Sequence, residues 1–388
     1  MKKPLFILGI AAFLLVGCSN EEDLANAWTD DNTEELFLED LSSNSPIVFG
    51  SVSGNATTRG SITSEGFAAN DIGIFCLSRK VLKSGKTMSW SKNSDTIFYK
   101  LNVWQDNVSA NIVPIDSSTS RVEWARPMED HFYPAPTAAW YAYDFYAYYP
   151  RTDSIVYSFQ SIWAMIDLDG TQDVIHAKAT AAANDTENVG YSYLYFRDNP
   201  SAENPQFNFT HKLARLNFKV KLKEDMPDSA KVHVDSLVIE DYLNRVYLVV
   251  ASTNPTSVGS IEVPDYNHKG NFILREKDNS SIRDKKEGSN YKYELSTTPI
   301  SVGDCLMIPP LPKSVSMSKL KIKVFLKDKK GSIYSPTSPL TLEAPADGWQ
   351  SGKSYDINIT LNDPIKVAST AKSTDWEDPT TTLDLDEP

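Results

Sequence analysis

The sequence has 388 residues, of which 41% are hydrophobic and 11% aromatic. A chain of this length and composition can bury the cores of two ordinary domains, and it falls outside the disordered class. With 38 basic against 51 acidic residues, the formal net charge is −13. Such a surface repels phosphate backbones, so we expect no nucleic-acid partner.

The N-terminal segment has the pattern of an export signal. Two lysines precede the apolar run Leu5–Val16, which is shorter than the roughly 20 residues that a membrane-spanning helix needs. The run ends in Leu15-Val16-Gly17-Cys18, which resembles the lipobox of bacterial lipoproteins. We predict a signal peptide over residues 1–17, cleavage between Gly17 and Cys18, and acylation of Cys18, with several chains such as palmitate anchoring a lipoprotein stably. A plain secretory signal with a chance cysteine is the alternative.

An acidic, serine-rich segment follows the lipobox. Residues 18–45 carry few apolar side chains, which is typical of a tether and not of a packed element. The triplet Glu21-Glu22-Asp23 resembles the surface-export signal of lipoproteins in some Gram-negative bacteria. An ordinary acidic linker explains the triplet equally well, and both interpretations stay open.

From Ile47 onward, the apolar residues recur with the period of a β-strand. The alternation is strictest in Leu216–Lys223, and Leu320–Val324 and Tyr355–Leu361 repeat it. Alternation of this kind places one face of a strand in a core and the other in water. Many short strands between Pro, Gly, Asn and Asp turns predict an all-β protein built of antiparallel β-sandwiches. A short helix is expected only near 173–183.

A polar stretch with two prolines, Asp198–Pro205, divides the folded part into halves of comparable size. We predict an N-terminal β-sandwich domain over residues 46–205. The C-terminal β-sandwich domain is predicted over residues 206–388.

One arginine lies in the polar stretch after the first apolar run. Ile47–Phe49 precedes it, and the next strand pattern begins at Asp71. The simplest interpretation of Arg59, which is followed by Gly60, is a charged side chain in a solvent-exposed loop. A protease cleavage site between these two residues is the alternative.

The densest aromatic segment is Trp140–Pro150. Its alternation sends Tyr143 and Phe145 to one face and Tyr146 and Tyr148 to the other. Aromatic strands of this kind form a core more often than a surface that stacks sugars, so we expect burial.

Residue patterns for catalysis or metal binding are weak. The five histidines are scattered without metal-ligand spacing, and Cys76 and Cys305 lie in strand-like runs as expected buried thiols. We expect no metal, no cofactor and no enzyme activity. A surface hydrolase remains a third hypothesis, since it would need converging carboxylates that a sequence does not reveal.

Taken in chain order, these segments resemble the fimbrillins, which are the subunits of type V pili, and their fimbrillin-like lipoprotein relatives. The resemblance covers nearly the whole mature chain. It rests on the lipobox at Cys18, Ile47–Phe49 followed by Thr58-Arg59, Asp71–Phe75, Tyr143–Pro150, Gln172–Ala177, Phe209–Leu216 and Trp349–Leu361.

The resemblance implies a location, a fold and a mechanism of assembly. The lipidated precursor would be a surface-exposed lipoprotein of the cell outer membrane. The family fold is two transthyretin-like β-sandwich domains in tandem. A trypsin-like, arginine-specific protease would cut between Arg59 and Gly60, and removal of the first strand, about Ile47–Val52, would open an apolar groove. An extended C-terminal segment of another subunit, with Thr381–Leu385 as the candidate, would fill the groove.

Two hypotheses about function follow. The first is a structural subunit precursor of a cell-surface fimbrium (pilus) with a role in adhesion, whose partners are other fimbrial subunits, an arginine-specific protease and host or bacterial surface ligands. The second is a surface glycan-binding lipoprotein that does not polymerise. They differ at Arg59, since a glycan-binding protein needs no processing loop there.

Overall fold

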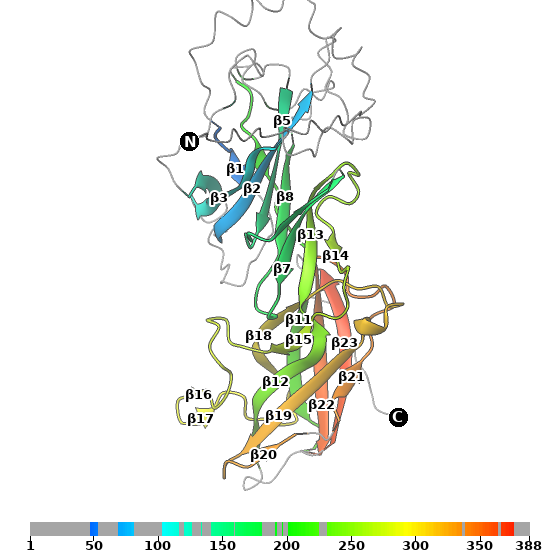
Figure 1. The fold of residues 1–388 in the computed structure, drawn as a ribbon. Helices are drawn as coiled ribbons and strands as arrows, with labels where there is room; N and C mark the ends of the chain where they lie inside the picture. Colours follow the sequence, from blue (N-terminus) through cyan, green and yellow to red (C-terminus); the bar gives the residue numbers. More distant parts are fainter. Residues whose placement is uncertain are drawn as a thin grey trace, which may run out of the picture.

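The computed structural model describes residues 47–52, 69–80, 103–115, 120–125, 133, 141–158, 160–180, 191, 196, 201–224, 231–335, 338–363 and 366–375. Its regular elements in these ranges are strands, apart from a 3₁₀ turn, η5 (Ser316–Ser318), which confirms the predicted all-β class. The same ranges hold no helix with the length and apolarity needed to cross a membrane. The sheets follow one another along an elongated molecule, from the N-terminal strands to the C-terminal ones (Figure 1).

The N-terminal sheet has eight strands in the order β1-β4-β3-β2-β5-β8-β10, with β9 also paired to β8. Its strands are β1 (Ser51–Val52), β2 (Ala69–Lys80), β3 (Val103–Pro114), β4 (Ser120–Trp124), β5 (Tyr141–Tyr149), β8 (Ile175–Thr180), β9 (Gln206–Phe207) and β10 (Thr210–His211). The central pair, β2 and β5, runs antiparallel from Gly73↔Tyr148 to Lys80↔Tyr141.

Strand β5 is buried on both faces, so the aromatic segment forms a core as predicted. Tyr143 and Phe145 belong to one apolar cluster, which fills the inside of the N-terminal sheet. Tyr146 and Tyr148 belong to a second cluster on the opposite face. The described side chains of this strand are therefore not an open sugar-stacking surface.

A second sheet covers that opposite face. It contains four strands in the order β14-β13-β7-β6. Their bounds are β6 (Ile155–Tyr157), β7 (Ser161–Asp167), β13 (Arg245–Ser252) and β14 (Ile261–Glu262). The pairing of β7 with β13, from Arg245↔Asp167 to Ser252↔Ser161, joins segments from the two sides of the boundary predicted after residue 205. The domain boundaries themselves stay a prediction.

Two further sheets enclose the C-terminal core. One has the order β18-β11-β22-β23, and the other β15-β12-β19-β20 with β21 also on β19. Their strands are β11 (Ala214–Leu222), β12 (Val232–Leu243), β15 (Lys269–Ile273), β18 (Ile300–Ile308), β19 (Leu320–Asp328), β20 (Ile333–Tyr334), β21 (Leu340–Leu342), β22 (Lys353–Asp363) and β23 (Lys366–Asp375). A small hairpin, β16 (Lys286–Glu287) and β17 (Asn290–Tyr291), stands apart from both.

The predicted alternation is confirmed in detail in β11. Its burial alternates along the whole strand, with Leu216, Phe218 and Val220 in the core. One expectation was wrong: β11 and β22 pair in parallel, from Arg215↔Ser354 to Leu222↔Leu361. The alternation of one strand reports its two faces and not the direction of its neighbour, and the long connection between these strands allows a parallel pair.

The helix expected near 173–183 is also wrong, since β8 lies there. Phe145↔Ala179 through Tyr149↔Ile175 pair this segment with β5. The ladder satisfies the backbone groups of this segment, and tertiary pairing overrides the helix propensity of its alanines. Cys76 and Cys305 are buried free thiols, as predicted.

Candidate functional site

The first segment of the described chain lies between two parts of the N-terminal sheet. On one side, β1 pairs with β4 through Ser51↔Arg121 and Val52↔Ser120. On the other side, the Gly50 amide donates to the Pro205 carbonyl oxygen at 2.9 Å, next to the start of β9. A segment hydrogen-bonded on both sides completes the sheet, which would otherwise expose unpaired backbone groups there.

The side chains of this segment alternate between the core and solvent. Ile47 and Phe49 are only 2% and 6% exposed, whereas Val48 between them is 51% exposed. The Trp124 indole Nε1 donates to the Ile47 carbonyl oxygen at 3.1 Å, which fixes the start of the segment against β4. Three consecutive residues thus have the in-out-in pattern of a strand that occupies a groove.

Aromatic side chains line the place where Phe49 lies. Its ring centroid is 5.2 Å from that of Trp124, 5.3 Å from Phe145 and 4.9 Å from Phe207, so the ring is enclosed by strands β4, β5 and β9. Burying one such side chain stabilises the folded state by roughly 1.5–3 kcal/mol. Without the first segment, this place would be an apolar cleft beside unpaired backbone groups. Such a cleft can accept another extended chain with apolar residues two positions apart.

The residues predicted as processing sites lie outside the described residues. This applies to Gly17 and Cys18 of the lipobox, and to Arg59 and Gly60, which follow β1 and precede β2 in the sequence. The structure therefore describes the strand that proteolysis would release, but not the bond that would be cut.

The C-terminal end is described as far as Asp375. Strand β23 lies at the edge of its sheet and pairs with β22 from Lys353↔Asp375 to Asp363↔Lys366. The candidate donor Thr381–Leu385 lies outside the described residues.

The structure also brings together residues that sequence reasoning missed. Ligand atoms of His233, Asp235 and Asp284 all lie within 4.8 Å of one another. The signal available in the sequence was the His-x-Asp spacing on one predicted strand, which places both side chains on the same face. The third residue, Asp284, is distant in sequence, and no local pattern predicts its place beside the other two.

The family match and one solved structure agree with this architecture. The sequence matches the fimbrillin-like family over residues 58–376. A fimbrial protein from Bacteroides vulgatus has 14% identity and a TM-score of 0.52, with 86% of our chain and 100% of its own chain covered. The tip fimbrial protein Mfa3 from Porphyromonas gingivalis, solved with a C-terminal truncation, has 10% identity and a TM-score of 0.35, with coverage of 86% and 100%.

No curated protein matches the chain. The family match spans well over half of the sequence, and the Bacteroides vulgatus structure supports the fold. The chain belongs to the fimbrillin-like family.

Proposed function

We propose that the protein is a structural, non-enzymatic subunit precursor of a cell-surface fimbrium with a role in adhesion. In this proposal, Cys18 carries the lipid anchor on the outer membrane, and an arginine-specific protease cuts between Arg59 and Gly60. The first strand then leaves, and a donor strand from another copy takes its place. Two tandem transthyretin-like domains, 46–205 and 206–388, are part of the same proposal.

The observation that carries the proposal is the way in which the first segment occupies its groove. Its backbone bonds to both neighbours, at Gly50 and at β1, and its two inward side chains complete an aromatic cluster. The segment is also the first part of the described chain, so one cut behind it would separate it from the strands that follow. A second chain could then replace the same hydrogen bonds and the same buried rings.

The C-terminal tail has the residue pattern that such a groove requires. Leu383 and Leu385 are two positions apart, like Ile47 and Phe49, and acidic residues alternate with them. We propose this segment as the donor, because two inward-facing leucines can fill the space of the departing pair.

The test uses purified full-length precursor and an arginine-specific protease under native conditions. We expect one cut after Arg59, release of the N-terminal peptide, and growth of polymers visible on native gels and by electron microscopy. Arg59→Lys keeps the charge and should resist the cut and stay monomeric. Leu383→Ser with Leu385→Ser should be cut normally but fail to polymerise.

Two results would reject the proposal. One is resistance of Arg59 to the protease, and the other is efficient cutting without any polymer from the unaltered chain. N-terminal sequencing of protein from sheared surface filaments gives an independent readout, because a fimbrial subunit should begin at Gly60. A protein that binds surface glycans without polymerising should keep the residues before Arg59.

A further inference from the structure

A β-bulge in β12 places two ligand-type side chains next to each other. The register with β19 shifts between Val234↔Leu326 and Ser236↔Phe325, so Asp235 is the extra residue without a partner in that ladder. Bulges re-aim side chains and are frequent beside functional sites. Here the bulge leaves both His233 and Asp235 buried near a loop that crosses the strand.

That loop connects β15 with β16 and supplies the third residue. Asp284 has a positive φ of 49°, the left-handed conformation that aspartate tolerates better than most residues.

 
The Asp284 carboxylate Oδ1 lies 3.3 Å from the His233 Nε2. Two ligands of a tetrahedral ion with bonds of about 2.0–2.1 Å are separated by roughly this distance.

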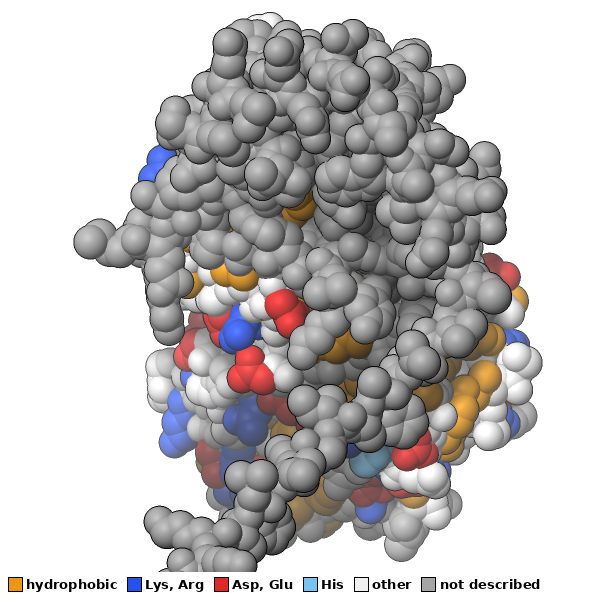
Figure 2. Space-filling view, turned by 45° about the horizontal axis from the view of Figure 1, so that its top comes forward, with side chains coloured by type: hydrophobic (Ala, Val, Ile, Leu, Met, Phe, Trp, Pro, Cys, Tyr) orange, Lys and Arg blue, Asp and Glu red, His pale blue; other side chains and the backbone are white. Residues whose placement is uncertain are grey.

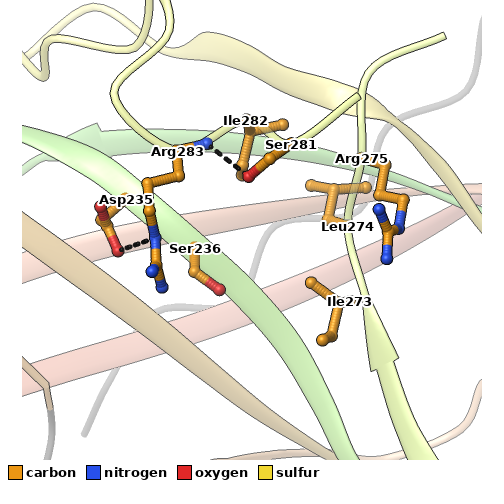
Figure 3. A pocket seen from close by; sticks show the side chains of 8 residues that line it. All are labelled: Asp235, Ser236, Ile273, Leu274, Arg275, Ser281, Ile282 and Arg283. Atoms are coloured by element: carbon orange, nitrogen blue, oxygen red, sulfur yellow. Dashed lines mark hydrogen bonds and ion pairs between the residues drawn. The ribbon is translucent and has the colours of Figure 1, made fainter. Parts of the chain in front are cut away.

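The carboxylate of Asp235 is buried without a hydrogen bond among the described residues, which is unusual for a charged group. The residue is 1% exposed, and neither carboxylate oxygen has a hydrogen-bond partner in the described structure. The Arg283 guanidinium lies beside it, with Nε 3.2 Å from Oδ2 (Figure 3). The Arg283 side chain is itself 62% exposed. A buried carboxylate without hydrogen bonds is costly, and a bound cation is one way of satisfying it.

A cavity lies beside one of the three residues, and a stacked ring holds the imidazole in place. A cavity of about 230 Å³ is lined by Asp235 and Arg283 among others, and Figure 3 shows both side chains beside it. The Tyr291 ring stacks on the His233 ring, with centroids 3.7 Å apart and planes 6° from parallel. This stacking fixes the ring plane, as a preorganised ligand requires.

We propose that His233, Asp235 and Asp284 form a binding site for a divalent transition-metal ion of the Zn²⁺ type. One imidazole and two carboxylates form a mixed nitrogen and oxygen ligand set, which suits an ion of this class. Ca²⁺ and Mg²⁺ prefer ligand sets made of oxygen atoms alone.

Two cations compete with the metal ion for these carboxylates. Arg283 lies beside Asp235, and the Lys327 Nζ bonds to Asp284 at 2.7 and 2.9 Å. A bound ion takes over their role, and both long side chains can turn toward solvent. The ion would also tie the loop that carries Asp284 to the bulge of β12.

The test is calorimetric titration of the untagged, chelator-treated mature chain with Zn²⁺, followed by Co²⁺ and its absorption spectrum. We expect one site for each chain, a higher melting temperature with Zn²⁺, and the intense visible bands of tetrahedral Co²⁺. Asp284→Asn should weaken binding at least tenfold. This residue lies on the loop with a side chain that is 41% exposed, so the variant should still fold.

The matched control is Asp265→Asn. Asp265 pairs with His268 at 3.5 Å in an exposed position elsewhere, so its loss should leave Zn²⁺ binding unchanged. The proposal is overturned if Zn²⁺ fails to bind at millimolar concentration, if Asp284→Asn binds as tightly as the unaltered chain, or if Ca²⁺ is preferred over Zn²⁺.

Discussion

Phe49 and Phe207 lie with ring centroids 4.9 Å apart, although one belongs to the first described segment and the other to β9. This contact joins the beginning of the N-terminal sheet to its far side. The Gly50 to Pro205 hydrogen bond runs beside it. Ring packing and backbone pairing therefore hold the same short segment, and loss of the segment would remove both.

Phe49→Ala should destabilise the N-terminal core. The ring is 6% exposed and contacts three aromatic rings, so the substitution should lower the free energy of unfolding by about 3–5 kcal/mol, as is usual for Phe→Ala in a core. Val48→Ala, at the exposed neighbouring position, should change it by no more than about 0.5 kcal/mol. Urea denaturation of both variants measures the difference, and equal effects would contradict the assigned faces.

Gly73→Ala should disturb the contact between β2 and β5. A Cβ at this position would lie 2.7 Å from Tyr148 Cζ and 2.5 Å from Asn107 Oδ1. The Tyr148 hydroxyl donates to that same Asn107 oxygen at 2.8 Å, so the ring is not free to withdraw. We expect a loss of about 1–3 kcal/mol from overpacking.

A double-mutant cycle tests the cause of that loss. Tyr148→Leu removes the ring that the new methyl group would meet, so Gly73→Ala should cost less in this background than alone. Additive effects would show that the clash with Tyr148 is not the reason why glycine is required.

His176 should make stability depend on pH. Burial lowers the pKa of this imidazole to about 3, with the nearby charges of Lys212 and Lys178 adding to the effect and the hydrogen bond to the Val250 carbonyl opposing it. In the unfolded chain its pKa is about 6.5. Between these two values the unfolded state binds a proton that the folded state does not. Stability from this group is therefore fully present above about pH 6.5 and falls with decreasing pH, by at most about 1.4 kcal/mol per pH unit.

His176→Gln should flatten that part of the pH profile. The Gln amide can still donate to the Val250 carbonyl oxygen, which accepts from His176 Nε2 at 2.8 Å. His268→Gln, at a side chain that is 45% exposed, serves as the control and should keep the slope. Melting temperatures between pH 3 and pH 7 measure it, and an unchanged slope in His176→Gln would refute the assignment.

On the face shown in Figure 2, acidic and basic side chains of the described surface are interspersed with apolar ones. The described side chains on this face therefore do not form one continuous acidic area.

Local pattern sufficed to predict the strands whose two faces differ in environment. In β11 and β19, every second residue is buried, and the sequence shows apolar and polar residues in the same alternation. Pattern was less informative for β8, where His176 is buried along with Ile175 and Ala177, so that both faces lie in the interior. Periodicity cannot distinguish such a segment from a buried helix.

Contacts between segments distant in the chain could not be predicted from local sequence patterns. Nothing local specifies that β7 pairs with β13, that β11 lies parallel to β22, or that Asp284 meets the bulge at Asp235. These relationships depend on how whole sheets pack, and pairing across long separations is decided by the total burial that a topology achieves.

The sequence by itself determined the all-β class, the alternation of the principal strands, the burial of the aromatic segment and the family resemblance, because each of these is a property of neighbouring residues. Only the tertiary structure decided that Ile47 and Phe49 fill a groove between β4 and β9, because that groove is built from residues distant in the chain. The same holds for the cluster of His233, Asp235 and Asp284, whose members become neighbours only when the loop folds across β12.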